Sequence, residues 1–497
     1  MAEFDLAIVG GGINGAGIAR DAAGRDLRVL LVEQNDLASG TSSASSKLIH
    51  GGLRYLEHAW FRLVREALSE REVMLRIAPH VVRPMRFVLP VEPSMRPLWM
   101  LRLGLFIYDH LGGRKLLPAS RAVDLAHGPL GAPLRQSYAH GFEYSDCWAD
   151  DARLVVLNAL DAAEHGAVIR TRTRCIGAER GKLWQLVLDA QGRRDLATAR
   201  VLINATGPWL GLFATNVLHS STPLPVRLDK GSHIVVRRLF EHDRGYIFQN
   251  RDGRVVFALP FEREFTLIGT TDRGFSGDPG RVHADNDEIA YLCDVANQHL
   301  RTAIKASDVV WAFAGVRALY DDGSRRSQDV TRDYVLELDE SGGAAPLLTV
   351  YGGKITTYRR LAEHALDRLA PLIKSGPPWT ERSHLPGGDF APGELDALVA
   401  MTRKSRLFLD EQHVRRLVRA YGTRVDRVLG AAKTRADLGP WLGADLTGAE
   451  VRYLMEREWA QRPDDVLWRR SKLGLQFSAP EREQLAQFMT SLVGGGV

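Results

Sequence analysis

The chain has 497 residues, 45% of them apolar and 25% charged, and this length exceeds what one hydrophobic core usually supports. The composition excludes wholesale disorder, and three widely separated cysteines exclude a disulfide scaffold and a thiolate zinc site, so we predict no metal centre. The net charge of +5 is too small to indicate nucleic-acid binding, and it is concentrated in residues 403–435, which hold 10 basic and 3 acidic residues.

The first residues predict a βαβ unit. Residues 6–9 and 29–32 are short apolar runs typical of buried strands, and residues 16–25 between them have a helical pattern. The start of the chain lacks the basic and apolar regions of a secretory signal, and no apolar run approaches the length of a membrane-spanning helix. We therefore expect neither a signal peptide nor a transmembrane helix.

The turn after the first strand has the spacing of a dinucleotide-binding loop. Gly10 permits a tight turn, Gly12 lets the backbone approach a pyrophosphate, and Gly15 lets the helix pack close to the strand. Glu33 ends the second strand, where a carboxylate accepts hydrogen bonds from ribose hydroxyls and repels the 2′-phosphate of NADP. A glycine-rich turn without a ligand is the alternative, but strand, helix and acidic residue all agree with nucleotide binding.

The middle of the chain predicts a mixture of strands and helices, and its end predicts helices alone. Residues 39–46 form a polar loop, and residues 61–78 and 151–165 have helical patterns. We expect strands at 167–175, 183–189, 201–204, 309–318 and 347–351, and several short antiparallel strands between 233 and 270. A helix from about 354 to 369 precedes a proline-rich linker that ends near 388, beyond which the pattern is helical.

Two further segments favour FAD over NAD. Residues 204–209 have the pattern of a strand that returns to a flavin, and residues 352–358 place glycines, Lys354 and threonines at a helix start. A helix start and an ammonium group would stabilise the negative charge of reduced flavin. An ordinary turn and a helix cap are the alternatives for these two segments.

Five blocks resemble the FAD-dependent glycerol-3-phosphate dehydrogenases. They are Thr41–Glu57, Gly141–Leu154, Lys230–His233, Gly269–Asp272 and Gly352–Tyr358. The resemblance spans nearly the whole chain and is greatest to the bacterial aerobic branch, which passes electrons to a quinone.

The resemblance implies a glycine-oxidase-like α/β fold. We expect a discontinuous Rossmann-like FAD-binding domain (1–80, 140–215 and 320–375), a substrate domain with a mixed or antiparallel sheet (81–139 and 216–319), and an all-helical carboxy-terminal domain (385–497). It also implies FAD contacts from Gly10, Gly12, Asn14, Gly15, Glu33, Thr41, Ser42, Ser46, Lys47, Leu48, His50, Gly51, Ala205, Gly207, Trp209, Gly353, Lys354 and Thr356.

The implied reaction oxidises sn-glycerol 3-phosphate to dihydroxyacetone phosphate by hydride transfer to FAD. The phosphate dianion requires cations, and Arg317 and Arg54 suit it because a planar guanidinium makes bidentate contacts. Tyr55 and Lys354 would add a hydroxyl and a point charge, and Thr270 is a weaker candidate for positioning the substrate.

Two histidines are candidates for the base that removes the hydroxyl proton. His50 precedes two glycines, and His233 opens an apolar strand. An imidazole with a pKa near 6.5 suits this task, and the residues favour His233 only slightly. A structural, hydrogen-bonded histidine is the alternative for each.

The possible functions differ in their electron acceptor. The family favours ubiquinone or menaquinone, and so a peripheral protein on the cytoplasmic face of the inner membrane. Two other functions remain open: a glycerol-3-phosphate oxidase that reduces O₂ and, more distantly, an amine or amino-acid oxidase. A homodimer also remains open as the oligomeric state. We expect an anionic membrane surface to contact one of two segments. Residues 96–115 are apolar and include Trp and Tyr between basic ends, and residues 403–435 would form a basic amphipathic helix.

Overall fold

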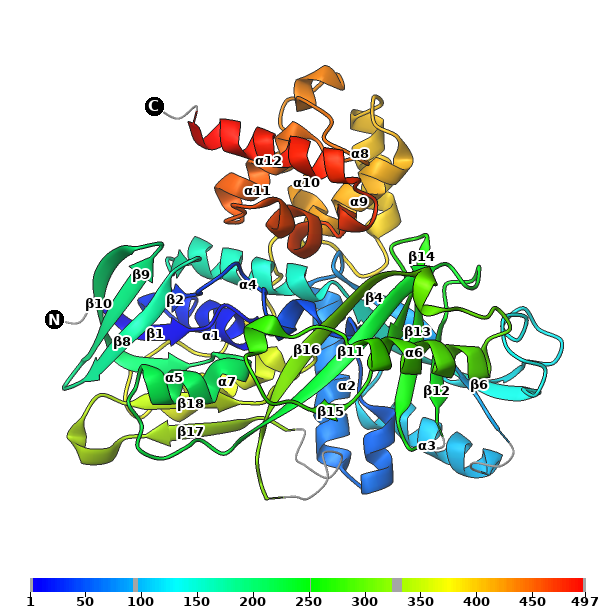
Figure 1. Cartoon of the computed structure of the whole chain (residues 1–497), viewed down its shortest axis with the longest axis horizontal. Helices are drawn as coiled ribbons and strands as arrows, with labels where there is room; N and C mark the ends of the chain where they lie inside the picture. The colour runs from blue at the N-terminus through cyan, green and yellow to red at the C-terminus, as the bar shows by residue number, and fades with distance from the viewer. Residues whose placement is uncertain (1–2, 93–96, 251, 324–332, 495–497) are drawn as a thin grey trace.

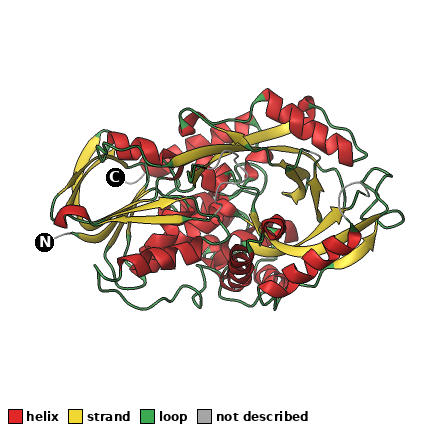
Figure 2. Ribbon diagram, turned by 90° about the horizontal axis from the view of Figure 1, so that it is seen from below, coloured by secondary structure: helices red, strands yellow, loops and turns green. Residues whose placement is uncertain are grey.

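The computed structural model describes residues 3–92, 97–250, 252–323 and 333–494. Two sheets with their helices lie side by side, and a group of helices formed by the carboxy-terminal residues packs over one side of them (Figure 1). Seen from below, after a 90° turn about the horizontal axis, the sheets form two curved layers with helices between and outside them (Figure 2). The predicted α/β fold class is confirmed.

The first sheet contains the predicted βαβ unit. Its strand order is β17-β18-β10-β1-β2-β7, and β1, β2, β7, β10 and β18 are parallel. A β8–β9 hairpin extends β10. The strands are β1 (Phe4–Val9), β2 (Val29–Val32), β7 (Val168–Arg170), β8 (Arg174–Arg180), β9 (Trp184–Ala190), β10 (Arg193–Asn204), β17 (Val335–Asp339) and β18 (Leu347–Tyr351).

Both faces of this sheet are covered. In β1, Leu6 and Ile8 pack in the core under α1 (Ile13–Ala23), α4 (Asp151–Glu164) and α7 (Tyr358–Leu369). Phe4 and Val9 face the opposite core, which the β8–β9 hairpin and α5 (Leu210–Asn216) complete. Such two-sided burial explains why the strands read as continuous apolar runs.

The second sheet is mixed, as predicted. Its order is β15-β11-β14-β13-β12-β4-β6-β3, with β16 paired to β11 and β5 to β6, and β4 lies parallel to β12. The strands are β3 (Leu48–Ile49), β4 (Val82–Pro90), β5 (Arg121–Asp124), β6 (His140–Ala149), β11 (Val226–Arg237), β12 (Gly245–Gln249), β13 (Val255–Phe261), β14 (Phe265–Gly269), β15 (Arg273–Gly274) and β16 (Val309–Tyr320). The accompanying helices are α2 (Phe61–Ile77), α3 (Leu98–Leu111) and α6 (Asn286–His299).

The carboxy-terminal region is helical and has its own core. Its α-helices are α8 (Leu395–Ser405), α9 (Glu411–Tyr421), α10 (Val425–Leu429), α11 (Gly448–Arg457) and α12 (Ala479–Gly494). Buried ion pairs join it to the first sheet's layer: Arg153 contacts Glu458, and Arg470 contacts Asp36 at 2.7 Å.

Two sequence-based expectations need correction. The strand expected at 167–175 is two strands, because the chain turns at Arg172 with a φ of +49°. The domain bounds stay a prediction; β6, which they group with the FAD-binding domain, pairs with β4 along its length in the second sheet. The two-residue strand β3 pairs with β6 in the same sheet.

The second correction concerns the basic segment 403–435. The apolar side chains expected to face a membrane, including Val414, Leu417 and Tyr421, are buried in the carboxy-terminal core. Arg416 is hydrogen-bonded to Asp445 and Glu450 and is largely buried. The apolar face of this helix therefore packs inside the protein and is not an anchor.

Candidate functional site

A cavity of about 710 Å³ lies at the carboxyl ends of the first sheet's parallel strands and continues to β11 and β16 of the second sheet. This is the edge at which open parallel sheets bind ligands. The predicted site residues that line it are Gly10, Gly12, Asn14, Glu33, Thr41, Ser42, Ser46, Leu48, His50, Tyr55, Ala205, Gly207, Trp209, His233, Thr270, Arg317, Gly353, Lys354 and Thr356.

The glycine turn brings bare backbone to the cavity. Gly10 has a φ of +115°, and a Cβ there would lie 2.4 Å from the carbonyl oxygen of Ala205. A Cβ on Gly15 would lie 1.9 Å from the carbonyl oxygen of Gly10, so Gly15 serves helix packing and does not line the cavity. Gly12 is the N-cap of α1, so the amino end of this helix opens toward the cavity without a capping side chain.

Glu33 is fixed at the end of β2. Its carboxylate accepts hydrogen bonds from the backbone N–H of Gly11 at 2.7 Å and of Asn35 at 2.8 Å. Burial raises the pKa of Glu33, while these two hydrogen bonds oppose that rise. Each oxygen keeps a lone pair for a further donor.

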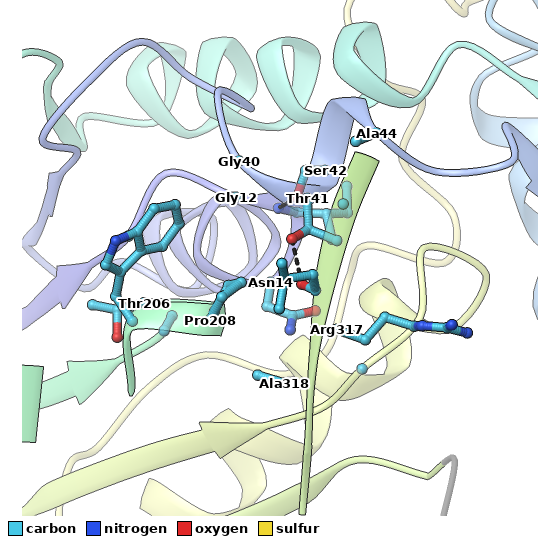
Figure 3. A pocket seen from close by; sticks show the side chains of 18 of the residues that line it. Gly12, Asn14, Gly40, Thr41, Ser42, Ala44, Thr206, Pro208, Arg317 and Ala318 are labelled. Atoms are coloured by element: carbon cyan, nitrogen blue, oxygen red, sulfur yellow. Dashed lines mark hydrogen bonds between the residues drawn. The ribbon is translucent and has the colours of Figure 1, made fainter. Parts of the chain in front are cut away.

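The polar loop closes the cavity between the two sheets. Thr41 donates a hydrogen bond to the carbonyl oxygen of Val316 at 2.5 Å (Figure 3), and the hydroxyl of Ser42 accepts one from the N–H of Ile13 at 3.0 Å. Lys47 does not line the cavity, because its buried ammonium contacts both carboxylate oxygens of Asp151 at 2.9 Å. Lys47 therefore anchors the loop.

Besides His233 Nδ1, two buried polar atoms at the cavity have no hydrogen-bond partner among the described residues. The amide nitrogen of Asn14 donates to the carbonyl oxygen of Gly352 at 3.0 Å, which leaves Oδ1 without a partner. The Nζ of Lys354 also lacks one and lies 4.1 Å from the centre of the Tyr55 ring. Such groups cost free energy unless a ligand satisfies them.

Arg317 extends from β16 away from Thr206 and Pro208 (Figure 3). Its guanidinium donates to a carboxylate oxygen of Asp272 at 2.8 Å. Sequence reasoning gave Asp272 no role, although this residue ends one of the recognised blocks. Arg54 and Gly51 are not among the lining residues; the N–H of Gly51 donates to the hydroxyl of Tyr108 at 2.8 Å.

The two candidate bases lie in different surroundings. Neither ring nitrogen of His50 has a hydrogen-bond partner among the described residues; burial, with Lys354 next, lowers the pKa of His50 to about 4. His233 shares a hydrogen bond of 2.9 Å between Nε2 and the hydroxyl of Ser46, and its Nδ1 is buried. Burial, with Lys47 and Arg317 next, lowers the pKa of His233 to about 3.

Residues 173–175 also line the cavity near Glu33, and sequence reasoning missed them. They follow the turn after β7, which reaches the site only because β7 pairs with β2. No local motif marks them, so only a correct strand order would have found them.

Comparisons with known proteins identify the family. The model described as FAD dependent oxidoreductase matches residues 5–359, and the model described as the C-terminal domain of alpha-glycerophosphate oxidase matches residues 378–493. A glycerol-3-phosphate dehydrogenase from Pseudomonas aeruginosa is 52% identical and covers 98% of this chain and 95% of its own length. A D-erythritol 1-phosphate dehydrogenase from Brucella abortus is 48% identical, with 97% of each chain covered.

A solved structure agrees. The glycerol-3-phosphate dehydrogenase from Bacillus halodurans, complexed with FAD, has a TM-score of 0.77 and 27% identity, and the match covers 99% of this chain and 92% of that one. The cavity fits the same cofactor, because it offers a bare glycine turn, a helix start whose N-cap residue is glycine, and the unsatisfied polar atoms of Asn14 and Lys354. FAD is thus the cofactor, and the chain belongs to the FAD-dependent oxidoreductases and, within them, to the FAD-dependent glycerol-3-phosphate dehydrogenases.

Proposed function

We propose that the chain oxidises sn-glycerol 3-phosphate to dihydroxyacetone phosphate and passes the electrons to a membrane quinone. The observation that carries the proposal is the pairing of cations with histidines along one cavity. Lys354 lies close enough to His50, and Arg317 to His233, for each cation to lower the pKa of its histidine. A phosphate needs such cations, and an alcohol needs a base.

Lys354 and Arg317 bind the phosphate in this proposal. The Nζ of Lys354 gains an acceptor that it otherwise lacks. Arg317 has to share its guanidinium between the phosphate and Asp272, or release Asp272. Tyr55 holds the Lys354 ammonium over its ring, and the binding energy of the phosphate orients C2 of the substrate.

His50 is the better placed base, which reverses the slight preference that the sequence gave to His233. Both ring nitrogens of His50 are available, whereas Nε2 of His233 is engaged by Ser46 and its Nδ1 is buried. Oxidation transfers a hydride from C2 and a proton from the hydroxyl; bound FAD supplies the hydride acceptor. His50 takes the proton, and the phosphate helps by neutralising Lys354, which otherwise lowers the pKa of His50.

The acceptor proposal rests on an exposed apolar face of α3. Trp99 is 68% exposed and Phe106 59% exposed, and Leu98 and Leu103 lie with them on the surface. The opposite face of the helix reaches the site, because the hydroxyl of Tyr108 accepts a hydrogen bond from the N–H of Gly51, beside His50. We infer that α3 lies on the inner membrane, on the cytoplasmic side, and brings the flavin site near a quinone.

Basic residues support the same orientation. Arg102, Arg114 and Lys115 lie in or just beyond α3 and favour anionic lipid; Arg96, expected to do the same, lies outside the described residues. In the described part of the chain, no helix is both long and apolar enough to cross a bilayer. Association with the surface is therefore the form we propose, and a homodimer stays a prediction.

Steady-state electron transfer tests the proposal. Purified protein should reduce a short-chain ubiquinone analogue with sn-glycerol 3-phosphate much faster than with D-erythritol 1-phosphate, glycerol or glycine, and should consume O₂ slowly. Preference for D-erythritol 1-phosphate would indicate that the substrate is a longer polyol phosphate. Rapid O₂ consumption without quinone would favour the oxidase reading, and turnover of glycine would refute phosphate recognition.

A further inference from the structure

Four aromatic rings in successive contact connect the carboxy-terminal region to the cavity. Trp468 stacks on Trp311, with ring centres 4.5 Å apart and planes at 28°. Trp311 meets Phe313 at 4.5 Å and 35°, and Phe313 stacks on His233 at 4.9 Å and 11°. We call these four residues the aromatic row. It begins in one core and ends in the wall of the flavin cavity.

The row follows from strand geometry. Alternate residues of a strand share a face, so Trp311 and Phe313 of β16 lie on the same face as Arg317. The antiparallel pairing of β11 with β16 sets Phe313 directly opposite His233. Rigid strand pairing therefore transmits the position of Trp311 to His233.

The outer end of the row is built to hold one ring. Trp468 belongs to a π-helical turn, Asp465–Arg470, a rare geometry that is often found at functional sites. A Cβ on Gly474 would lie 2.6 Å from the indole, so glycine is needed there. The Arg482 guanidinium covers the indole at 5.5 Å.

The inner end depends on the row. A Cβ on Gly269 would lie 2.0 Å from the His233 ring, so that ring is confined between Gly269 and Phe313. Among the described residues, its only hydrogen bond is the one to Ser46, and Nδ1 has none. Stacking therefore sets the plane of the imidazole.

We propose that Trp468 is a positioning residue for the oxidation. Through Trp311 and Phe313 it holds the His233 imidazole in the cavity wall. The imidazole lies there near the proposed phosphate ligand Arg317, while proton transfer stays with His50. The helical carboxy-terminal region thereby takes part in flavin reduction without touching the substrate. The kinetic part of this inference rests on the proposed function; the structural part, the state of His233, does not.

His233 offers a readout apart from activity. Burial, Lys47 and Arg317 lower its pKa, while Asp151 raises it. If the row loosens, water reaches the ring and its pKa rises from about 3 toward 6.5. NMR of holoenzyme labelled at histidine Cε1 follows this titration, and the His233 signal among the 15 histidines is assigned by its absence in His233→Asn.

The test compares three variants. Trp468→Leu removes the outer ring and keeps apolar bulk, and Trp468→Phe restores a ring. Trp441→Leu is the matched control, because Trp441 packs against the same core but meets His413 edge-on, at 79°, and does not belong to the row. We expect Trp468→Leu to slow anaerobic flavin reduction about tenfold at unchanged FAD content and to raise the His233 titration midpoint. Trp468→Phe and Trp441→Leu should resemble the parent protein.

The outcomes separate the claims. An unchanged His233 titration in Trp468→Leu, an unchanged reduction rate beside a changed titration, or equal effects of Trp441→Leu would each overturn the inference. Should Trp468→Leu not fold, Phe313→Leu breaks the row at its centre and must give both changes. If sn-glycerol 3-phosphate fails to reduce the parent protein, the proposed function fails, and the His233 titration still decides the role of Trp468.

Discussion

At the residue scale, Arg317, which we propose as a phosphate ligand, is already paired with a carboxylate. Its guanidinium is held by Asp272 at 2.8 Å, at the edge of the cavity. The carboxylate offsets part of the cost of a partly buried charge before substrate arrives. Lys354 lacks such a partner among the described residues, so a carboxylate balances the charge of Arg317 but not that of Lys354.

Arg317→Leu should lower kcat/KM for sn-glycerol 3-phosphate about a hundredfold, because the phosphate orients C2 as well as binding. Stopped-flow reduction of the flavin measures this effect. Arg273→Leu is the matched control: it removes the same charge from exposed β15, outside the cavity. Equal losses on glycerol and on its phosphate would contradict the phosphate role of Arg317.

Gly12→Val should abolish FAD binding, because the side chain would enter the space that the backbone leaves for the pyrophosphate. A Cβ there already lies 3.1 Å from the Ser42 hydroxyl, which holds the N–H of Ile13. Absorbance near 450 nm after purification measures bound flavin. Gly274→Val, at a position with open space around it, should keep FAD; full flavin occupancy in Gly12→Val would refute the assignment.

The pH dependence of kcat/KM should report the pKa of the catalytic base in the free enzyme. Burial favours neutral His50 and lowers its pKa to about 4, so activity should persist below pH 6.5 and fall only as the pH approaches 4. Asn in place of His50 should remove this acid limb along with most activity. An acid limb unchanged in His50→Asn and lost in His233→Asn would assign the proton transfer to His233.

At the element scale, α3 exposes apolar side chains as an interfacial helix does, and α9 does not. Both are apolar and basic in sequence, but α9 buries its apolar face in a core, while α3 exposes Trp99 and Phe106. Only tertiary packing distinguishes the two helices, so the sequence alone could not decide which of them contacts a membrane.

Trp99→Ser combined with Phe106→Ser should weaken binding to anionic vesicles in a sedimentation assay, and salt should weaken it further. Met401→Ser combined with Leu407→Ser is the matched control, since these side chains are 65% and 84% exposed elsewhere on the surface. Binding that both double variants lose equally, or that neither loses, would show that α3 is not the anchor.

Local patterns explain how much of this fold the sequence predicts. The βαβ unit depends on neighbouring residues and is confirmed, and Gly10, Gly12 and Glu33 line the cavity. β6 and the β7–β8 turn depend on pairing with distant strands, which no local pattern reveals. Lys47 and Gly51 were expected at the cofactor from their position in a block, but their contacts lie with Asp151 and Tyr108.

At the scale of the whole molecule, two sheets meet at one cavity and the carboxy-terminal helices pack beside them. The first sheet supplies the glycine turn, the second supplies Arg317 and His233, and the carboxy-terminal helices are fastened to the first layer by buried arginines, including Arg470 on Asp36. The two proposed phosphate ligands thus come from different sheets, since Lys354 follows β18 of the first and Arg317 lies in β16 of the second. The account requires that both act on one substrate.

Anaerobic reduction of the bound flavin by sn-glycerol 3-phosphate tests that requirement most directly. Mixing should bleach the flavin absorbance fully within a single rapid phase, whereas glycerol and sn-glycerol 1-phosphate should bleach it far more slowly. A flavin that stays oxidised with sn-glycerol 3-phosphate, or that is reduced equally fast by glycerol, would contradict the account.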